Sequence, residues 1–424
     1  MIKLFPTAED FPKFKESWKK DLVAGVTVGI VALPLALAFG ITTGTGAASG
    51  LITAVIAGFL AAFFGGSNFQ VSGPTGAMTV VLVPIVSKYG ITVLPLIGLF
   101  AGIIVLIAGI LQLGAIIKRV PWSVMEGFTL GIALVIALQQ LPGALAVKSV
   151  SGHGTVGTAI NTFRHALSIG LNWQALLVVA ITLTIKFGYP KLAEYWNFRI
   201  HVPASFVAIV IANLLLQLTN FTLPTVGDLP KNLFKWANLD NNIAISNLVI
   251  PILEIALLAA IESLLSARVA DGMVQHQDFF HPYNPNRELF GQGLASIFSS
   301  VFGGLPATGA IARTGVNVRS GARTRAAATI HALFLLVAVF ILNPIISQIS
   351  TASLAAILIG TSYRIARPSA IKEALATTKL DASILLITAL IVLTIDLIWG
   401  ILIGTVLYFI LNKLIMRAKS KSNQ

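Results

Sequence analysis

The chain has 424 residues, of which 56% are hydrophobic and only 11% are charged, whereas a soluble globular protein carries about 25% charged residues. A water-soluble protein of this length could not cover its surface with so few charges, which excludes soluble enzymes and nucleic-acid-binding proteins. The net charge of +13 is therefore interpreted as a membrane orientation signal rather than as a nucleic-acid signal. The absence of cysteine excludes disulfides, thiolate nucleophiles and thiolate metal sites.

Fourteen apolar segments run through the chain, and a helix needs about 20 apolar residues to span a bilayer. Before them, residues 1–21 are polar and Lys-rich, and they are not a cleavable signal because the first apolar run is long enough to span. After them, residues 417–424 form a short basic tail. The third and tenth segments are too short to span, and Gly and Pro precede both. The predicted segments are 22–41, 47–66, 74–88, 91–112, 121–142, 168–188, 200–219, 248–269, 288–303, 309–319, 322–343, 345–362, 380–395 and 398–416.

Lys and Arg are distributed unevenly over this topology. With the N-terminus inside, 23 of the 29 fall on the inner side and five on the outer side, and Arg313 lies within the tenth segment. This split follows the positive-inside rule and indicates an even number of spans, with both termini cytoplasmic. We therefore expect a multi-pass protein of the cell membrane with one transmembrane domain, residues 22–416.

A short pattern occurs twice at matching positions. Phe-Gly-Gly at 64–66 is followed by Thr-Gly-Ala at 75–77, and Phe-Gly-Gly at 302–304 is followed by Thr-Gly-Ala at 308–310. The two copies open segments that are seven apart and so have opposite orientations, which predicts a 7+7 inverted repeat, although a Gly-rich chain can share such motifs by chance. Two helix N-termini that meet inside a membrane present free N–H groups and positive dipole ends, and such a point attracts an anion.

Glu262 is the carboxylate that lies deepest within a predicted span, where charge is costly and indicates function by default. Ser266 shares its helix face at i+4. The two are interpreted as a protonatable or cation-coordinating site, with a structural carboxylate paired to Arg313 as the alternative. Arg313 lies five residues after Thr308 and would deepen an anion site, or else extend to the inner membrane surface.

Motifs for catalysis and for ATP hydrolysis are missing from the sequence. It has no HExxH, no paired Asp-rich motif and no Walker loop, so we expect neither an enzyme nor an ATP-driven pump, and no catalytic residue, cofactor or metal. His331 stands alone in an apolar helix and is interpreted as a packed residue. Pro34 interrupts the first span, and a kink there would bring Phe39 near the site, as a lining or a packing residue.

Several of these stretches resemble the SulP (sulfate permease) family, the bacterial relatives of the solute-carrier 26 anion transporters. The resemblance extends from about residue 15 to residue 416. The matching stretches are 21–25 with 32–40, 72–78, 260–266, 286–289 with 291–293, and 303–314.

The resemblance implies an all-α membrane protein whose inverted repeat is divided into core and gate domains, with transport by an elevator-like movement of the core. It places a small inorganic or organic anion between the third and tenth half-helices, with a proton or sodium as the coupling ion, and leaves a homodimer open. The substrate-binding residues that it implies are Phe39, Ser72, Pro74, Thr75, Gly76, Thr308, Ala312 and Arg313, and those for the coupling ion are Glu262 and Ser266.

The sequence departs from the family in two respects. Members usually carry a cytoplasmic STAS domain after the last span, and residues 417–424 do not contain one. The sodium-coupled bicarbonate branch typically has Asp where Glu262 stands and lacks an arginine at Arg313, so this chain is closer to the proton-coupled branch. We expect a proton-coupled carrier of sulfate, a C4-dicarboxylate or bicarbonate. A sodium–bicarbonate symporter, a nucleobase carrier and an anion channel or exchanger are the alternatives.

Overall fold

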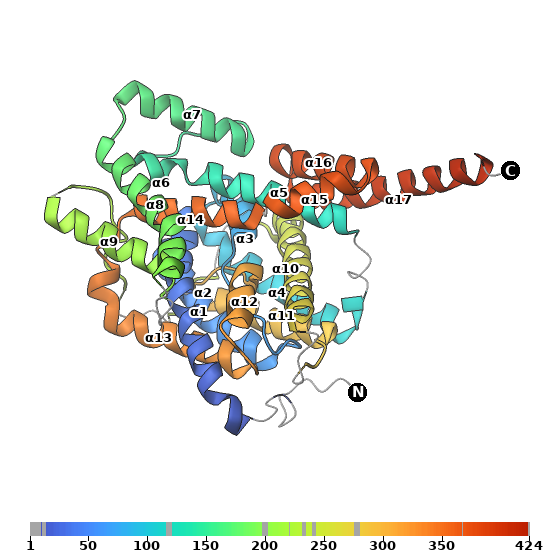
Figure 1. Ribbon diagram of the computed structural model, residues 1–424, viewed down its shortest axis with the longest axis horizontal. Coiled ribbons are helices and arrows are strands. Elements are labelled where there is room, and N and C mark those ends of the chain that lie inside the picture. Colours follow the sequence, from blue (N-terminus) through green and yellow to red (C-terminus); the bar gives the residue numbers. More distant parts are fainter. Residues whose placement is uncertain are drawn as a thin grey trace. The chain divides into compact units, whose positions relative to one another are not determined.

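The computed structural model describes residues 10, 14–115, 121–196, 202–219, 221–230, 235–239, 243–274, 280–366 and 368–422. Three parts of the predicted elements lie outside the described residues: most of the polar N-terminal segment 1–21, the first two residues of the 200–219 span, and the last two residues of the tail. Each of the fourteen predicted segments corresponds to a helix (Figure 1). Eight described helices are long and apolar enough to cross a membrane.

Three helical segments were not predicted. α6 and α7 occupy most of residues 143–167, between the fifth and sixth predicted spans, and α15 lies between the twelfth and thirteenth predicted spans. The predicted tail 417–424 continues α17 to Ser422. The helices are α1 (Phe14–Thr42), α2 (Ala47–Phe64), α3 (Gly76–Tyr89), α4 (Leu94–Ile110), α5 (Trp122–Gln139), α6 (Leu141–Leu145), α7 (Gly154–Ile169), α8 (Trp173–Tyr195), α9 (Ala204–Thr219), α10 (Ile245–Val274), α11 (Pro285–Val301), α12 (Ile311–Arg319), α13 (Ala326–Ile346), α14 (Thr351–Ala366), α15 (Pro368–Thr377), α16 (Lys379–Thr394) and α17 (Leu397–Ser422).

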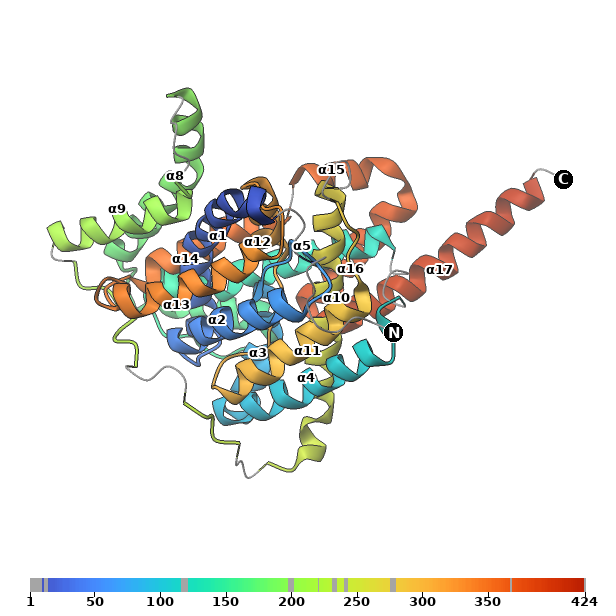
Figure 2. The ribbon, with the colours of Figure 1, turned by 90° about the horizontal axis from the view of Figure 1, so that it is seen from below.

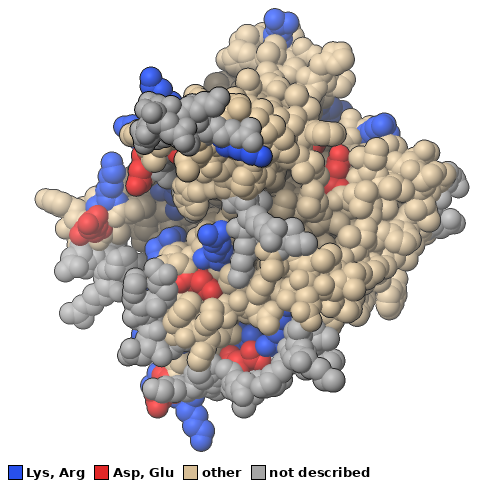
Figure 3. All heavy atoms as spheres, turned by 90° about the vertical axis from the view of Figure 1, so that its right-hand side faces the viewer, with Lys and Arg blue, Asp and Glu red and all other residues tan. Residues whose placement is uncertain are grey.

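The chain forms two compact units. The first contains residues 1–117 and 172–357, and the second contains residues 118–171 and 358–424, so the boundary falls within α14. In the second unit, α5 packs against α16 and α17. In the first, α1 packs against α13, and α4 runs along α11 (Figure 2). On the face drawn in Figure 3, most of the described surface is uncharged, and most of the acidic and basic side chains lie on its left-hand half.

The close approach of α4 and α11 depends on glycine. A Cβ added at Gly293 would lie 2.5 Å from the backbone nitrogen of Leu106, so no larger residue fits without moving α4. Small residues at such contacts let the backbones of membrane helices approach closely. Close packing matters here because lipid is as apolar as the side chains, so the hydrophobic effect does not drive the helices together. This packing holds α11 against α4, and α11 also contacts β2.

The two short helices, α3 and α12, begin beside a pair of two-residue strands. We call this strand pair, together with the starts of α3 and α12, the crossing. Strand β1 (Ser72–Gly73) precedes α3, strand β2 (Thr308–Gly309) precedes α12, and the strands pair antiparallel with Ser72 opposite Gly309 and Gly73 opposite Thr308. The two Thr-Gly-Ala motifs do not occupy equivalent places: Thr308 and Gly309 form β2, whereas Thr75 and Gly76 follow β1 and cap and begin α3. Because the strands are antiparallel, α3 and α12 leave the crossing in opposite directions, as an inverted repeat requires.

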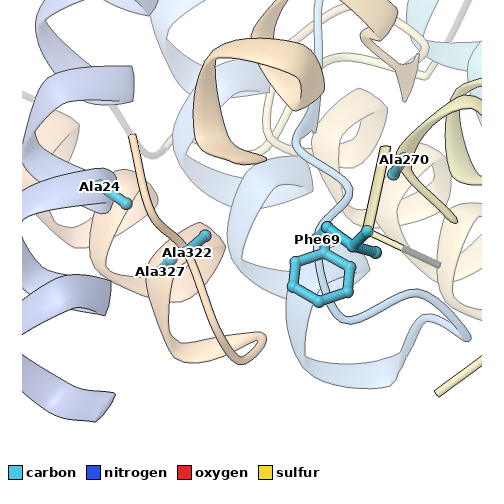
Figure 4. Close-up of a cluster of buried hydrophobic side chains, with 6 residues drawn as sticks. Ala24, Phe69, Ala270, Ala322 and Ala327 are labelled. Atoms are coloured by element: carbon cyan, nitrogen blue, oxygen red, sulfur yellow. The ribbon is translucent and has the colours of Figure 1, made fainter. Parts of the chain in front are cut away.

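A cluster of small side chains around Phe69 holds the segment that leads into β1. Phe69 is fully buried among residues of α1, α10 and α13, including Ala24, Ala270 and Ala327 (Figure 4). Asn317 of α12 donates a hydrogen bond from Nδ2 to the Phe69 carbonyl, 2.8 Å away. The approach to β1 is therefore fixed by packing and by a bond to the other half of the crossing.

We predict that Gly73→Ala lowers the melting temperature of the detergent-purified protein. Gly73 has a φ of +147°, and an added Cβ would lie 2.8 Å from Nη1 of Arg313 and 3.3 Å from Cα of Ala54. Backbone strain of this kind costs about 1–3 kcal/mol. Gly272→Ala is the matched control, because nothing lies within 4 Å of its added Cβ. Equal melting temperatures for the two variants would contradict the role of Gly73 in the crossing.

Candidate functional site

Free backbone donors gather at the crossing. Ala310, which precedes α12, provides no side-chain cap, and the first amide bonded within that helix is that of Thr314, to the Ala310 carbonyl at 2.8 Å. The amides of Ile311, Ala312 and Arg313 therefore have no acceptor among the described residues. Ala312 is exposed, whereas Arg313 is buried. The start of α12 thus offers accessible N–H groups and the positive end of a helix dipole.

The start of α3 is closed differently. Thr75 caps it by accepting a hydrogen bond at Oγ1 from the Met78 amide, 3.3 Å away. The same hydroxyl donates to Oε2 of Glu262 at 2.9 Å. Thr75 thereby joins the first half-helix to the carboxylate of α10, and all three residues are buried. The hydroxyls beside Glu262 are those of Thr75 and Thr308, and not that of Ser266.

Ser266 contacts α12 instead. Its Oγ lies 3.0 Å from Oγ1 of Thr314, which also accepts a hydrogen bond from the Val71 amide at 3.0 Å. One turn earlier, Oγ of Ser263 lies 3.2 Å from Oγ1 of Thr308 and accepts from the Gly309 amide at 3.0 Å. Ser263 and Ser266 of α10 thus bind the crossing, and the coupling-ion role of Ser266 stays a prediction.

Arg313 lies across the crossing. Its Nη2 donates to the Pro74 carbonyl at 2.7 Å, which ties α12 to the residue that precedes Thr75. The side chain is only 2% exposed, and Nη1 has no hydrogen-bond partner. Arg313 and Glu262 attract each other electrostatically, but no ion pair within 4.0 Å joins them, so the predicted alternative of a structural pair is not what this structure contains. Arg313 also does not extend to a surface.

Of the remaining predicted residues, Ser72 and Gly76 lie at the same crossing, and Phe39 lies in a helix that contacts both half-helices. Ser72 donates from its hydroxyl to Oε1 of Gln292 in α11, at 2.9 Å. Gly76 is the first residue of α3 and is buried. Phe39 is buried in α1, which runs through Pro34 as one helix and packs against α3 and α12.

Sequence reasoning missed several polar residues that support the site. Glu288 accepts hydrogen bonds from the amides of Gly66 and Ser67 and from Nε2 of Gln70, at 2.8, 2.9 and 2.6 Å. Ser263, Gln292 and Thr314 were missed as well. Their signal was a polar side chain inside an apolar segment, which is too common to select these positions without contacts.

The arrangement favours an anion beside a residue that can exchange a proton or bind a cation. Two helix N-termini and a buried guanidinium supply positive charge, while backbone N–H groups supply directed donors. Glu262 supplies a carboxylate among hydroxyl groups, which are hard oxygen ligands. No group of three His, Cys, Asp or Glu suited to a metal ion occurs among the described residues.

Comparison with known proteins agrees with this geometry. The model of the Sulfate permease family matches residues 18–388. The chain is 34% identical over 405 residues to the "Putative sulfate transporter YvdB" of Bacillus subtilis, covering 93% of this chain and 73% of that protein.

Two solved structures share the fold. The transmembrane domain of a cyanobacterium bicarbonate transporter, BicA, superposes with a TM-score of 0.80 at 30% identity, covering 91% of this chain and 97% of that chain. Murine Slc26a9, an anion transporter in the inward-facing state, gives a TM-score of 0.82 at 17% identity, covering 97% and 71%. These likenesses confirm the predicted fold class, an all-α membrane protein of about fourteen segments in a 7+7 inverted repeat.

We predict that Thr75→Val destabilises the protein, because it removes the cap of α3 and the hydroxyl that donates a hydrogen bond to Glu262. Losing a helix cap alone costs about 0.5–2 kcal/mol. Thr75→Ser keeps both bonds and should melt within about 2 °C of the wild type. Thr79→Val is the matched control, because the Thr79 hydroxyl bonds only to the carbonyl of Thr75 in the preceding turn. If Thr75→Val melts like Thr79→Val, the cap at Thr75 does not stabilise the crossing.

Proposed function

Because this chain belongs to the Sulfate permease family, we propose that it is a secondary active transporter that carries a small anion across the cell membrane together with protons. Transport, rather than catalysis, is proposed because the relatives named above are transporters. The observation that carries the proposal is the crossing itself, where two helix N-termini, Arg313 and Glu262 lie in one buried cluster. Both termini are proposed to be cytoplasmic, from the distribution of Lys and Arg.

The proposed substrates are oxyanions and carboxylates: sulfate, bicarbonate or a C4-dicarboxylate. The names of YvdB and BicA support the first two. The uncapped start of α12 would bind the anion through the amides of Ile311, Ala312 and Arg313, and the guanidinium of Arg313 would neutralise its charge. A neutral nucleobase would leave Arg313 buried without a counter-charge.

Movement of the site as one body is proposed for transport. The residues of the crossing all belong to the first compact unit. So do α10 and α11, which contact the crossing through serine and glutamine side chains. An elevator-like displacement of that unit would carry the anion and Glu262 together without breaking the hydrogen bonds that hold them.

Sodium coupling is the second candidate, favoured by the hydroxyl oxygens around Glu262. Uptake into proteoliposomes tests both candidates with a panel of sulfate, bicarbonate, fumarate, succinate and chloride, with and without a pH or a sodium gradient. Proton coupling predicts uptake that rises as the external pH falls. Uptake that depends on the sodium gradient and not on the pH gradient would make sodium, rather than the proton, the coupling ion. Currents far above the turnover of a carrier would indicate a channel, and accumulation of no anion under any gradient would contradict the proposed function.

Arg313→Ala should weaken anion binding by about 1–3 kcal/mol, the range for losing a charge-assisted hydrogen bond. Arg313→Lys should keep part of the affinity, because it keeps the charge but not the planar fork. Calorimetric titration of the purified protein with sulfate and with bicarbonate measures the change. Arg319→Ala, at the exposed end of the same helix, is the control. Unchanged affinity in a folded Arg313→Ala protein would remove Arg313 from the site.

Glu262→Gln should uncouple transport from the proton gradient. Glutamine imitates the protonated carboxyl and can still accept from Thr75, so the anion site should survive while the proton cycle stops. We expect anion–anion exchange to persist and accumulation driven by a pH gradient to be lost. Both are measured on the same liposomes. Accumulation at the wild-type level would make Glu262 a structural residue.

A further inference from the structure

Two buried arginines lie together at the end of α2, away from the crossing. Arg287 belongs to α11, and Arg325 directly precedes α13. Both bind the carboxylate of Asp10. Nη1 and Nη2 of Arg287 donate to Oδ1 and Oδ2 of Asp10 at 2.8 and 3.1 Å, and Nη2 of Arg325 donates to Oδ1 at 2.7 Å. The planar fork of arginine recognises carboxylate and phosphate groups in this way.

The two guanidinium groups are also held by bonds that do not involve Asp10. Nη1 of Arg325 donates to three carbonyls at the end of α2, at 3.4, 3.0 and 3.1 Å. Its Nη2 donates to Oδ1 of Asn68 at 3.0 Å, and Nε of Arg287 donates to the Phe64 carbonyl at 3.3 Å. The C-terminal end of a helix carries partial negative charge, which favours cations there. The arginine pair would therefore keep its place if Asp10 left it.

The space that Asp10 would vacate needs an anion. Both guanidinium groups bind one and the same oxygen atom, so they lie close together and repel each other when no anion stands between them. The neighbouring carboxylate of Glu288 does not fill this role, because it accepts from two backbone amides and from Gln70. An oxyanion of about the size of a carboxylate would fit the vacated volume and restore the charge balance.

This pair of arginines is closed on one side and open on the other. The Arg325 side chain is 1% exposed, whereas those of Arg287 and Asp10 are 10% and 11% exposed. An incoming anion would reach Arg287 first as Asp10 leaves. Helix α1 need not move, because Asp21 ties it to the turn before α13 by accepting from two backbone amides there, at 2.7 and 3.0 Å.

We propose that Arg287 and Arg325 form a second anion site, in which Asp10 is a tethered occupant that a small free oxyanion replaces. Phosphate, sulfate and small carboxylates are the ligands of this class. Asp10 competes as an intramolecular ligand, so the free anion must reach roughly millimolar concentrations. An anion that accumulates on this side of the membrane would thereby release the segment before α1. That this side is cytoplasmic rests on the proposed function, whereas the replacement of Asp10 does not.

Chemical rescue of Asp10→Ala tests the site, with sodium formate as the probe. At ten times its Kd, formate should raise the melting temperature of the purified variant by about 2 °C. Sodium chloride at equal concentration should raise it less, because chloride cannot bind a guanidinium through two oxygens. The double variant Asp10→Ala, Arg287→Gln should lose this difference between the salts. Glu16→Ala, which removes an exposed carboxylate of α1, is the matched control and should show no larger difference than the wild type. A difference in Asp10→Ala no larger than that of the control overturns the proposal.

Hydrogen exchange tests the wild-type protein and remains decisive where Asp10→Ala does not fold. Saturating inorganic phosphate should speed amide exchange in the peptide that contains Asp10. Exchange at the end of α2 should stay slow, because phosphate takes over the bonds of the carboxylate to both arginines. Sodium chloride at equal ionic strength is the control. Unchanged exchange around Asp10 overturns the proposal, and so does faster exchange at both places, because salt would then loosen the whole cluster.

Lipid headgroups offer the same phosphate chemistry, so a third arm compares nanodiscs of phosphatidylcholine and of phosphatidylglycerol without added phosphate. Exchange around Asp10 should be equally slow in both. Faster exchange in phosphatidylglycerol would assign the arginines to a lipid and overturn a site for a free oxyanion. None of these measurements involves transport. Proteoliposomes that accumulate no anion would contradict the proposed function and leave the second site unaffected.

Discussion

A broken helix inside a membrane must find partners for its backbone groups without water, and this requirement organises the first unit. The crossing meets it with protein groups. The strands bond to each other, the Ala310 amide donates to the Val71 carbonyl at 2.8 Å, and hydroxyls of α10 and α12 accept from the remaining strand amides. The donors that stay free are those at the helix starts. Because the rest of the break is sealed, positive potential is concentrated where a ligand can replace the missing acceptors.

The two halves of the repeat differ in how their short helices begin, and the difference gives each a separate task. At α3, a threonine caps the helix and binds a carboxylate, so the positive end is partly compensated. At α12, an alanine stands in the corresponding place and an arginine follows, so positive charge is reinforced. An inverted repeat with identical halves would place like groups on both sides of the substrate. In this chain both charged residues, Glu262 and Arg313, belong to the second half, and the first half contributes the Thr75 hydroxyl and the Pro74 carbonyl that bind them.

Sequence patterns were sufficient for the fold, but not for the hydrogen bonds that join the residues of the candidate site. Hydropathy placed every apolar segment, and the repeated motifs marked the starts of the two short helices, although only the second Thr-Gly-Ala falls in a strand. A two-residue strand has no periodicity, so its register could not be predicted. The i+4 spacing placed Ser266 with Glu262 on one face of α10. Spacing along one helix does not say which residues of other helices a side chain contacts, and the hydroxyl of Ser266 contacts that of Thr314 in α12. The helix α7 was missed because its polar residues resemble a loop.

The hydrogen bonds of the crossing also constrain how the site can move. They join β1, β2, α10, α11 and α12, which are far apart in the chain, and each buried bond that opened would expose an unsatisfied group in a medium without water. Opening the site by separating α3 from α12 would break the strand pairing and the bond from Arg313 to Pro74 together. Displacing the unit as a whole breaks none of them. The same bonds that seal the interrupted helices therefore favour transport by movement of an intact site over transport by a gate within it.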